Sequence, residues 1–163
     1  MKTDVLSDTL IKMKVKTSVA GAFDGAGRFA IEIPAYKGFK LHLLLKGERY
    51  VAIQGEKTFH RINVGDCFLM TGGRPFTISS DPETKKKVKI ETLLPLRRNG
   101  VITHNGGGEF YSIGVNVVFD GHLPKMLLGH LPPIIHIPGD SDQAAILKWS
   151  LERFCTEFLG SRV

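Results

Sequence analysis

No stretch of this 163-residue sequence approaches the roughly 20 apolar residues that a helix needs to cross a bilayer. The first eight residues, Met1 to Asp8, contain no hydrophobic segment of the kind found in signal peptides. The two cysteines, Cys67 and Cys155, lie far apart and lack the spacing of zinc ligands, which favours reduced thiols over a disulfide framework. We therefore expect a cytoplasmic protein with no membrane partner.

Acidic residues are also few, because 16 of them face 22 basic residues and leave a net charge of +6. Much of this excess lies in the run from Lys85 to Lys89 and in Lys12, Lys14 and Lys16. Such runs are usually solvated faces, and no aromatic residues alternate with these lysines as stacking on single-stranded nucleic acid requires. We predict that this chain does not itself bind nucleic acid.

What the sequence does contain is the pattern of one mainly β domain. From Val15 to about Val118, short runs of Val, Ile, Leu and Phe are interrupted about every 8 to 12 residues by Gly, Pro, Asn or Asp. About eight strands at this spacing favour a β-sandwich or a jelly-roll β-barrel. The predicted strands are Thr17–Ala22, Arg28–Ile33, Phe39–Leu45, Arg49–Gln54, Lys57–Asn63, Asp66–Met70, Phe76–Ser79 and Glu109–Val118.

Helical patterns lie at the two ends of this region. Residues 4–13 predict a short N-terminal helix, residues Leu123–Leu131 predict another that Pro132 ends, and Ser141 or Asp142 is a suitable N-cap for a helix to about Leu159. We therefore expect a barrel over residues 1–138, with its short helix at about 123–131, and a C-terminal helix within residues 139–163.

The C-terminal helix carries a narrow apolar stripe. Its spacing suits a helix that packs against one other element, and either the barrel or a second subunit could supply that element. We predict a dimerisation helix, with covering of the barrel as the alternative. The stripe consists of Ala144 followed by the predicted dimerisation residues Leu147, Leu151, Phe154 and Phe158.

The segment from Gly65 to Phe76 resembles the second sequence motif of cupins. In that motif a glycine, a proline-like turn position and a second glycine precede a metal-binding histidine. Here the second glycine is Gly73, the turn position is Thr71 and the histidine position is Phe76. The resemblance implies a cupin-like barrel in which one metal ligand is replaced by an aromatic residue.

The segment that ends at Gly47 is similar to the end of the first cupin motif, and it places the other three ligand positions near Pro34, Tyr36 and Lys40. Pro and Phe offer no donor atom, Lys must first lose a proton, and Tyr is an uncommon ligand. The six histidines also lack the HxH and HxxxH spacings of metal sites. The resemblance therefore implies a barrel with no metal, no cofactor and no catalytic residues.

The more specific resemblance is to the N-terminal sensor domain of AraC-type transcriptional regulators. It rests on the opening from Asp4 to Asp8, on Asn105 and the three glycines after it, and on two longer blocks, Leu127–Ile137 and Trp149–Arg153. In that family a small-molecule-binding barrel and a dimerising helix precede two helix-turn-helix motifs that bind DNA. The chain stops where those motifs would follow, so the resemblance implies either an excised sensor domain or a stand-alone relative.

If Lys40 takes the inward position of the cupin glutamate, strand alternation places His42 and Leu44 on the same interior face. The expected ligand-binding residues are Tyr36, Lys40, His42 and Phe76. A buried ammonium needs a partner, which a carboxylate or phenolic effector, or a protein carboxylate such as Glu32, could provide. A register error of one residue would turn Lys40 outward, so both orientations stay open.

These residues predict an effector-sensing and dimerisation domain of a transcription regulator, without catalysis, that forms a homodimer and reaches DNA only through a domain outside this chain. The alternative is a stand-alone cupin enzyme, of isomerase or dioxygenase type, with a non-standard site. A third hypothesis is a barrel that serves only as an oligomerisation scaffold, which would enclose no cavity.

Overall fold

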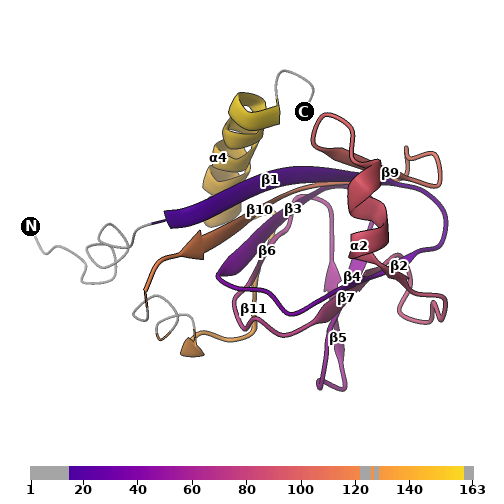
Figure 1. Cartoon of the computed structure of the whole chain (residues 1–163), viewed down its shortest axis with the longest axis horizontal. Helices are drawn as coiled ribbons and strands as arrows, with labels where there is room; N and C mark the ends of the chain where they lie inside the picture. The colour runs from indigo at the N-terminus through magenta and orange to yellow at the C-terminus, as the bar shows by residue number, and fades with distance from the viewer. Residues whose placement is uncertain (1–14, 122–125, 127–128, 160–163) are drawn as a thin grey trace, which may run out of the picture.

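The computed structural model describes residues 15–121, 126 and 129–159, without the side chains of residues 15–19, 147, 151 and 154–159. Two β-sheets face each other and form a flattened barrel, as expected for a cupin-like jelly roll (Figure 1). One sheet has six strands in the order β11-β6-β3-β10-β1-β9, and the other has five in the order β5-β4-β7-β2-β8.

The strands of the six-stranded sheet pair mainly antiparallel, as in jelly rolls. Its strands are β11 (Ile134–Ile137), β6 (Cys67–Met70), β3 (Phe39–Lys46), β10 (Phe110–Phe119), β1 (Val15–Gly25) and β9 (Val101–His104). The strands of the five-stranded sheet are β5 (Phe59–Ile62), β4 (Arg49–Ile53), β7 (Phe76–Ser79), β2 (Ala30–Ile33) and β8 (Val88–Lys89).

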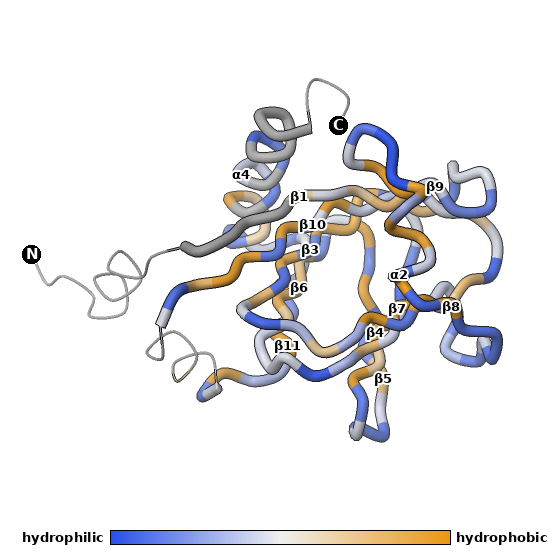
Figure 2. The backbone as a smooth tube through the Cα atoms, viewed as in Figure 1, coloured by the Kyte–Doolittle hydropathy of each residue, from blue (hydrophilic) through white to orange (hydrophobic). Residues whose placement is uncertain are grey.

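The main core lies between the two sheets. Leu44, Val51, Ile62 and Phe68 are fully buried there, because alternate residues of each strand point to the interior. Residues of high hydropathy lie on strands such as β4 and β7, whereas the most hydrophilic residues lie in peripheral loops (Figure 2).

A second core lies on the outer face of the six-stranded sheet, where Leu43, Cys67 and Ile113 are fully buried. Helix α4 (Asp142–Leu159) contacts β1, β10 and β6 on this sheet. The Ser141 hydroxyl accepts a hydrogen bond of 3.1 Å from the amide of Ala144, which confirms the predicted N-cap. Ala144 itself is buried, so the helix begins by covering the barrel.

All eight predicted strands are present, with ends that differ by a few residues. Sequence patterns missed β8, β9, β11 and the connection formed by helix α2 (Ile90–Leu93) and the 3-10 helix η1 (Leu94–Leu96). These elements have only two to four residues each. The predicted helix at 4–13 and most of the one at Leu123–Leu131 lie outside the described residues.

Candidate functional site

The barrel interior contains a cavity of about 390 Å³ between the two sheets. Its lining residues come from β1, β2, β3, β4, β7, β9 and β10 and from α2 and η1, which connect the five-stranded sheet to the six-stranded sheet (Figure 1). Most of the lining is apolar, with Phe23, Ile31, Ile33, Ile78 and Ile102 among its residues. This volume and composition are those of a small-molecule pocket.

Three of the four predicted ligand-binding residues, Tyr36, Lys40 and His42, line this cavity. On β3, Lys40 pairs with Asn116 of β10 and His42 pairs with Gly114, so that all four face inward. Of the two orientations that the sequence left open for Lys40, the structure shows the inward one. Glu32 lines a separate hollow instead of this cavity and makes no ion pair with Lys40 among the described residues.

Phe76, the fourth predicted residue, is buried behind the cavity wall and does not line it. Its ring meets the ring of Tyr36 edge-on, with 5.9 Å between the ring centroids. The ammonium of Lys40 lies over the Tyr36 ring, 5.4 Å from the ring centroid. Phe76 therefore packs against a lining residue, Tyr36, and is not itself one of the lining residues.

The four positions where cupin metal ligands are expected thus come together in space, with Pro34 also in the cavity wall. They form a cluster of aromatic, aliphatic and ammonium groups, which are poor metal donors. Within the described ranges, no group of three His, Cys, Asp or Glu residues is placed to hold a metal ion. The residues do not fit the metal site of metal-dependent cupins.

Burial changes the pKa values of the two ionisable side chains in this cluster. It lowers the pKa of Lys40 and raises the pKa of Tyr36, although the amides of Gly72 and Gly73 partly oppose the rise for Tyr36. The neutral forms of both side chains are therefore favoured more than in water. A ligand that carries negative charge would reverse this effect on Lys40.

His42 lies in the middle of the cavity wall and stacks on Phe68, with 4.8 Å between the ring centroids and 7° between the ring planes. Gly114 makes room for this ring, since a Cβ atom at that position would lie 2.9 Å from Nδ1 of His42. Burial, followed by the charges of Arg49 and Lys40, lowers the pKa of His42 to about 3. The imidazole is therefore neutral at physiological pH.

Arg49 is a cavity residue that the sequence interpretation missed. It begins β4, and only 2% of its surface is exposed. Its guanidinium lies 5.1 Å from the centroid of the Phe23 ring, and burial lowers its pKa to about 10. It alternates with the buried residues Val51 and Ile53, and this period of two could have placed it inside.

Five buried polar atoms of the cavity residues have no hydrogen-bond partner in the described part of the chain. Buried polar groups in proteins are nearly always paired, so this concentration in one cavity is unusual. These atoms are enclosed almost completely by protein atoms, so the open part of the cavity is bounded by other atoms of the same residues. The atoms are the Tyr36 hydroxyl, Nε2 of His42, Nε and Nη2 of Arg49 and Oδ1 of Asn116.

Comparisons with known proteins agree with this geometry. A family model described as Cupin (Cupin_6) matches residues 4–163. A Streptomyces lividans protein named as an AraC-like transcription regulator is 29% identical over 148 residues, which are 91% of this chain and 48% of that protein. A protein of the same name from Streptomyces antibioticus is 26% identical, with the same coverage.

Among solved structures, an apo crystal structure of a ToxT variant from Vibrio cholerae superposes with a TM-score of 0.51 and 9% identity, over 91% of this chain and 54% of that one. This likeness concerns the fold alone. The chain spans about half the length of the curated relatives it matches. None of the helices in the described ranges is long and apolar enough to span a membrane.

Proposed function

Since the chain belongs to the cupin family and is similar over 91% of its length to AraC-like transcription regulators, we propose that it is the N-terminal sensor domain of such a regulator, which senses a small-molecule effector and controls transcription without catalysis or a bound metal. The observation that carries this proposal is the cavity of about 390 Å³, whose mainly apolar walls include the polar residues Lys40, His42 and Arg49. A barrel that served only as a scaffold would have its interior filled by side chains.

The absence of catalysis is proposed on the chemistry of the cavity residues. His42 is neutral and stacked on Phe68, and the described cavity lining offers it no Ser, Cys or carboxylate arranged as a nucleophile and base. The alternative enzyme hypothesis needs a metal or an improvised site. Elemental analysis of the purified protein tests it, because a stoichiometric metal would support the enzyme and contradict the sensor.

We further propose that the domain works as a homodimer in the cytoplasm and that α4 supplies the dimer contact. Residues Leu147, Leu151, Phe154 and Phe158 stay the predicted contact, and their side chains lie outside the described set. DNA binding belongs, in this proposal, to a helix-turn-helix domain outside this chain. The effector then shifts the population between two arrangements of barrel and dimer helix.

A ligand screen with matched variants tests the sensing function. Small molecules that raise the melting temperature of the wild-type protein are retested on Lys40→Ala and His42→Ala, which remove cavity groups, and on Lys46→Ala, which changes an exposed residue at the end of β3. We expect both cavity variants to weaken binding at least about tenfold and Lys46→Ala to leave it unchanged. Unchanged affinity in both cavity variants would contradict the site.

A further inference from the structure

We propose that Lys40 is a nucleophile, and that it binds an apolar aldehyde or ketone reversibly as an imine inside the barrel cavity. This inference rests on the proposed sensing function and adds the chemical class of the effector and the atom that captures it. It is carried by the position of the Lys40 ammonium, its lack of a counter-ion and the apolar lining around it.

The first argument is that the ammonium of Lys40 is accessible from the cavity. Lys40 lies on β3 among the lining residues, and its Nζ lies over the ring of Tyr36, 5.4 Å from the centroid. Several other lining residues have polar atoms that the protein encloses, but Nζ of Lys40 is not one of these atoms. A molecule that enters the cavity can therefore reach this nitrogen, as a covalent bond requires.

The second argument is that Lys40 has no counter-ion. It makes no ion pair or hydrogen bond with any described residue. The one carboxylate among the described lining residues is Glu91 on α2, which is exposed and does not pair with Lys40. A structural lysine that is removed from water normally has a carboxylate partner. An unpaired lysine in an apolar pocket is instead the arrangement found in lysines that react with carbonyl compounds.

Burial also makes this amine more reactive. Only the neutral amine attacks a carbonyl carbon, and an ordinary lysine has about one neutral amine in 2,500 at pH 7. Each unit by which the pKa falls raises this share about tenfold. Because burial lowers the pKa of Lys40, a larger share of its side chain is neutral at physiological pH than in water.

The proposed reaction needs no further reactant. The ammonium gives a proton to water, and the neutral amine adds to the carbonyl carbon while the C=O π electrons pass to the oxygen. A proton then moves from nitrogen to oxygen, which gives a carbinolamine. The hydroxyl takes up a proton and leaves as water, while the nitrogen lone pair forms the C=N bond and the nitrogen releases its last proton. Hydrolysis reverses each step, so the ligand is released when its concentration falls.

The apolar lining limits the rest of the ligand. Ile31, Ile33, Ile78 and Ile102 would surround its body, which favours an aromatic or aliphatic carbonyl compound over one with many hydroxyls. Such a lining also excludes water from the imine, which slows its hydrolysis. The ligand class is therefore an apolar aldehyde or ketone.

Reductive trapping on the 163-residue protein tests this inference. 2-Naphthaldehyde or decanal is added with sodium cyanoborohydride, which reduces an imine to a stable amine, and the labelled lysine is identified by mass spectrometry. We expect Lys40 to be labelled at least about tenfold faster than the exposed Lys46 on the same strand. The labelling rate of Lys40 should also reach its plateau at a lower pH in the folded protein than in the urea-unfolded protein, because burial lowers its pKa.

Matched variants and probes locate the reaction at Lys40. Lys40→Arg keeps the positive charge but has no amine that forms an imine, so it should lose the fast labelling. The control Lys46→Arg should keep it. In calorimetry, 2-naphthalenemethanol should bind the wild type at least about tenfold more weakly than 2-naphthaldehyde, because an alcohol forms no imine. 2-Naphthoate, which would pair with a charged Lys40, should also bind more weakly than the aldehyde.

The opposite results would overturn the inference. Labelling of wild-type Lys40 no faster than Lys46 would show that Lys40 is not the nucleophile, whether or not Lys40→Arg folds. Equal affinity for the aldehyde and the alcohol would contradict imine formation. Tighter binding of 2-naphthoate than of the aldehyde would assign Lys40 to an ion pair. Each of these results leaves the sensing function intact, because the ligand screen tests that function separately.

Discussion

Two residues of the cavity, Arg49 and His42, carry ionisable groups in an environment that disfavours their charged forms. Such groups reduce the stability of the unliganded protein, and a ligand that satisfies them recovers the difference. At the residue scale, the free energy of unfolding of Arg49 and His42 variants should therefore test the site even before an effector is identified.

Replacing Arg49 with Met should stabilise the protein in the absence of ligand. The substitution removes an unpaired buried charge, and we expect the free energy of unfolding in urea to rise by about 1–2 kcal/mol after the loss of the cation–π contact with Phe23. The control is Arg61→Met, an exposed arginine that pairs with Glu48 at 3.0 Å and should change stability by less than about 1 kcal/mol. A clear loss of stability in Arg49→Met would show that Arg49 is satisfied within the protein.

His42 should make stability depend on pH. Its folded pKa of about 3 lies below the usual 6.5, so the unfolded chain binds more protons between these values. The stability that neutral His42 contributes is therefore complete above pH 6.5 and is lost as pH falls toward 3. His42→Gln should flatten the pH dependence of unfolding in this window, and NMR of the ring should report neutral His42 down to about pH 4. A ring that titrates near pH 6.5 would contradict this prediction.

At the scale of elements, the approach of the Tyr36 loop to β10 depends on Gly38. This residue has a φ of +74°, and a Cβ atom would lie 1.9 Å from the carbonyl oxygen of Val117. Gly106 has a similar φ of +82° but open space around it. Both substitutions with alanine introduce backbone strain of about 1 kcal/mol, and only Gly38→Ala adds a clash with backbone.

We therefore expect Gly38→Ala to be at least about 2 kcal/mol more destabilising than Gly106→Ala in chemical unfolding. It should also weaken any ligand that contacts Tyr36 or Lys40, because the clash displaces the loop that carries Tyr36 and the start of β3. Equal effects of the two substitutions would mean that β3 and β10 can separate at this point without cost.

A second connection between elements is the carboxylate of Asp66, which lies just before β6 and is almost fully buried. It accepts hydrogen bonds from the amides of Asn63 at 2.9 Å and Gly139 at 2.7 Å, and Nε2 of His136 lies 2.7 Å from it. Burial alone would raise the pKa of Asp66, but these hydrogen bonds lower it. The group thus joins β6 to β11 and to the residues that lead into α4.

Asp66→Asn should destabilise the protein by about 1–3 kcal/mol, because one amide nitrogen of the asparagine would face a backbone N–H donor. Hydrogen exchange should accelerate at residues 134–139, and the exposed control Asp140→Asn should change neither quantity. Because the folded pKa of Asp66 is lowered, its contribution is present above pH 3.8 and is lost below it. The variant and the wild type should therefore converge in stability at acidic pH.

The sequence predicted strands β1 to β7, β10 and the C-terminal helix, because their apolar runs are bounded by turn residues or repeat over several turns of helix. It also located Tyr36, Lys40 and His42 through the cupin motif. It missed Arg49, because a charged residue beside a turn is normally exposed, and only the burial of Val51 and Ile53 on the same face indicates otherwise. It predicted Phe76 as a cavity residue, whereas Phe76 is packed in the core against Tyr36 and is not among the lining residues.

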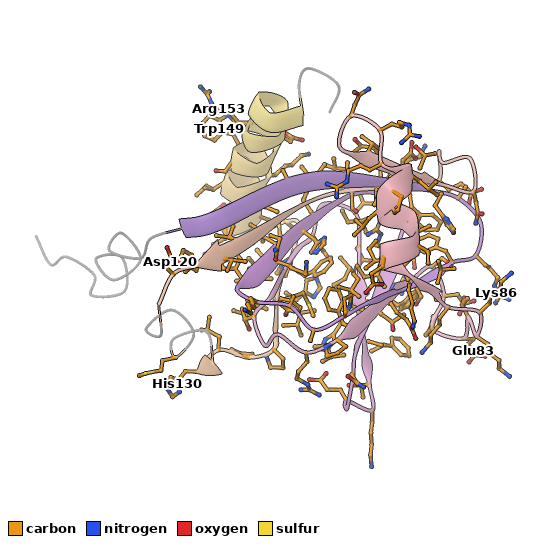
Figure 3. The ribbon with its side chains drawn as sticks, in the orientation of Figure 1. Glu83, Lys86, Asp120, His130, Trp149 and Arg153 are labelled. Carbon is orange, nitrogen blue, oxygen red and sulfur yellow. The ribbon has the colours of Figure 1, made fainter. Side chains whose placement is uncertain are left out.

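At the scale of the whole molecule, α4 has two different faces. Ala144 is buried against the barrel, whereas Ile146 and Trp149 are 67% and 62% exposed. Trp149 and Arg153 project away from the sheet, with the guanidinium 5.3 Å from the ring centroid of Trp149 (Figure 3). In Figure 1 the helix starts behind β1 and extends beyond it at its C-terminal end. Covering of the barrel and a dimer contact can therefore belong to different turns of the same helix.

Sedimentation should identify the dimer contact. Leu151→Asp, within the predicted contact stripe, should convert a dimeric protein to a folded monomer, because it places a charge in an apolar interface. Ser150→Asp adds the same charge at an exposed position of the same helix and should leave the dimer intact. Unchanged sedimentation of Leu151→Asp, together with dissociation of Trp149→Asp, would place the contact on the outward face instead.

Strand β10 separates the cavity from α4 by a single layer of backbone. Gly114 and Asn116 line the cavity, Ile113 belongs to the second core on the outer face of the sheet, and Val115 belongs to that core and also contacts the cavity. A molecule that rotates this strand about its own axis would move both faces at once. Communication between the interior and the helix then needs no chain of intermediate residues, and its speed would be set by the stiffness of one strand.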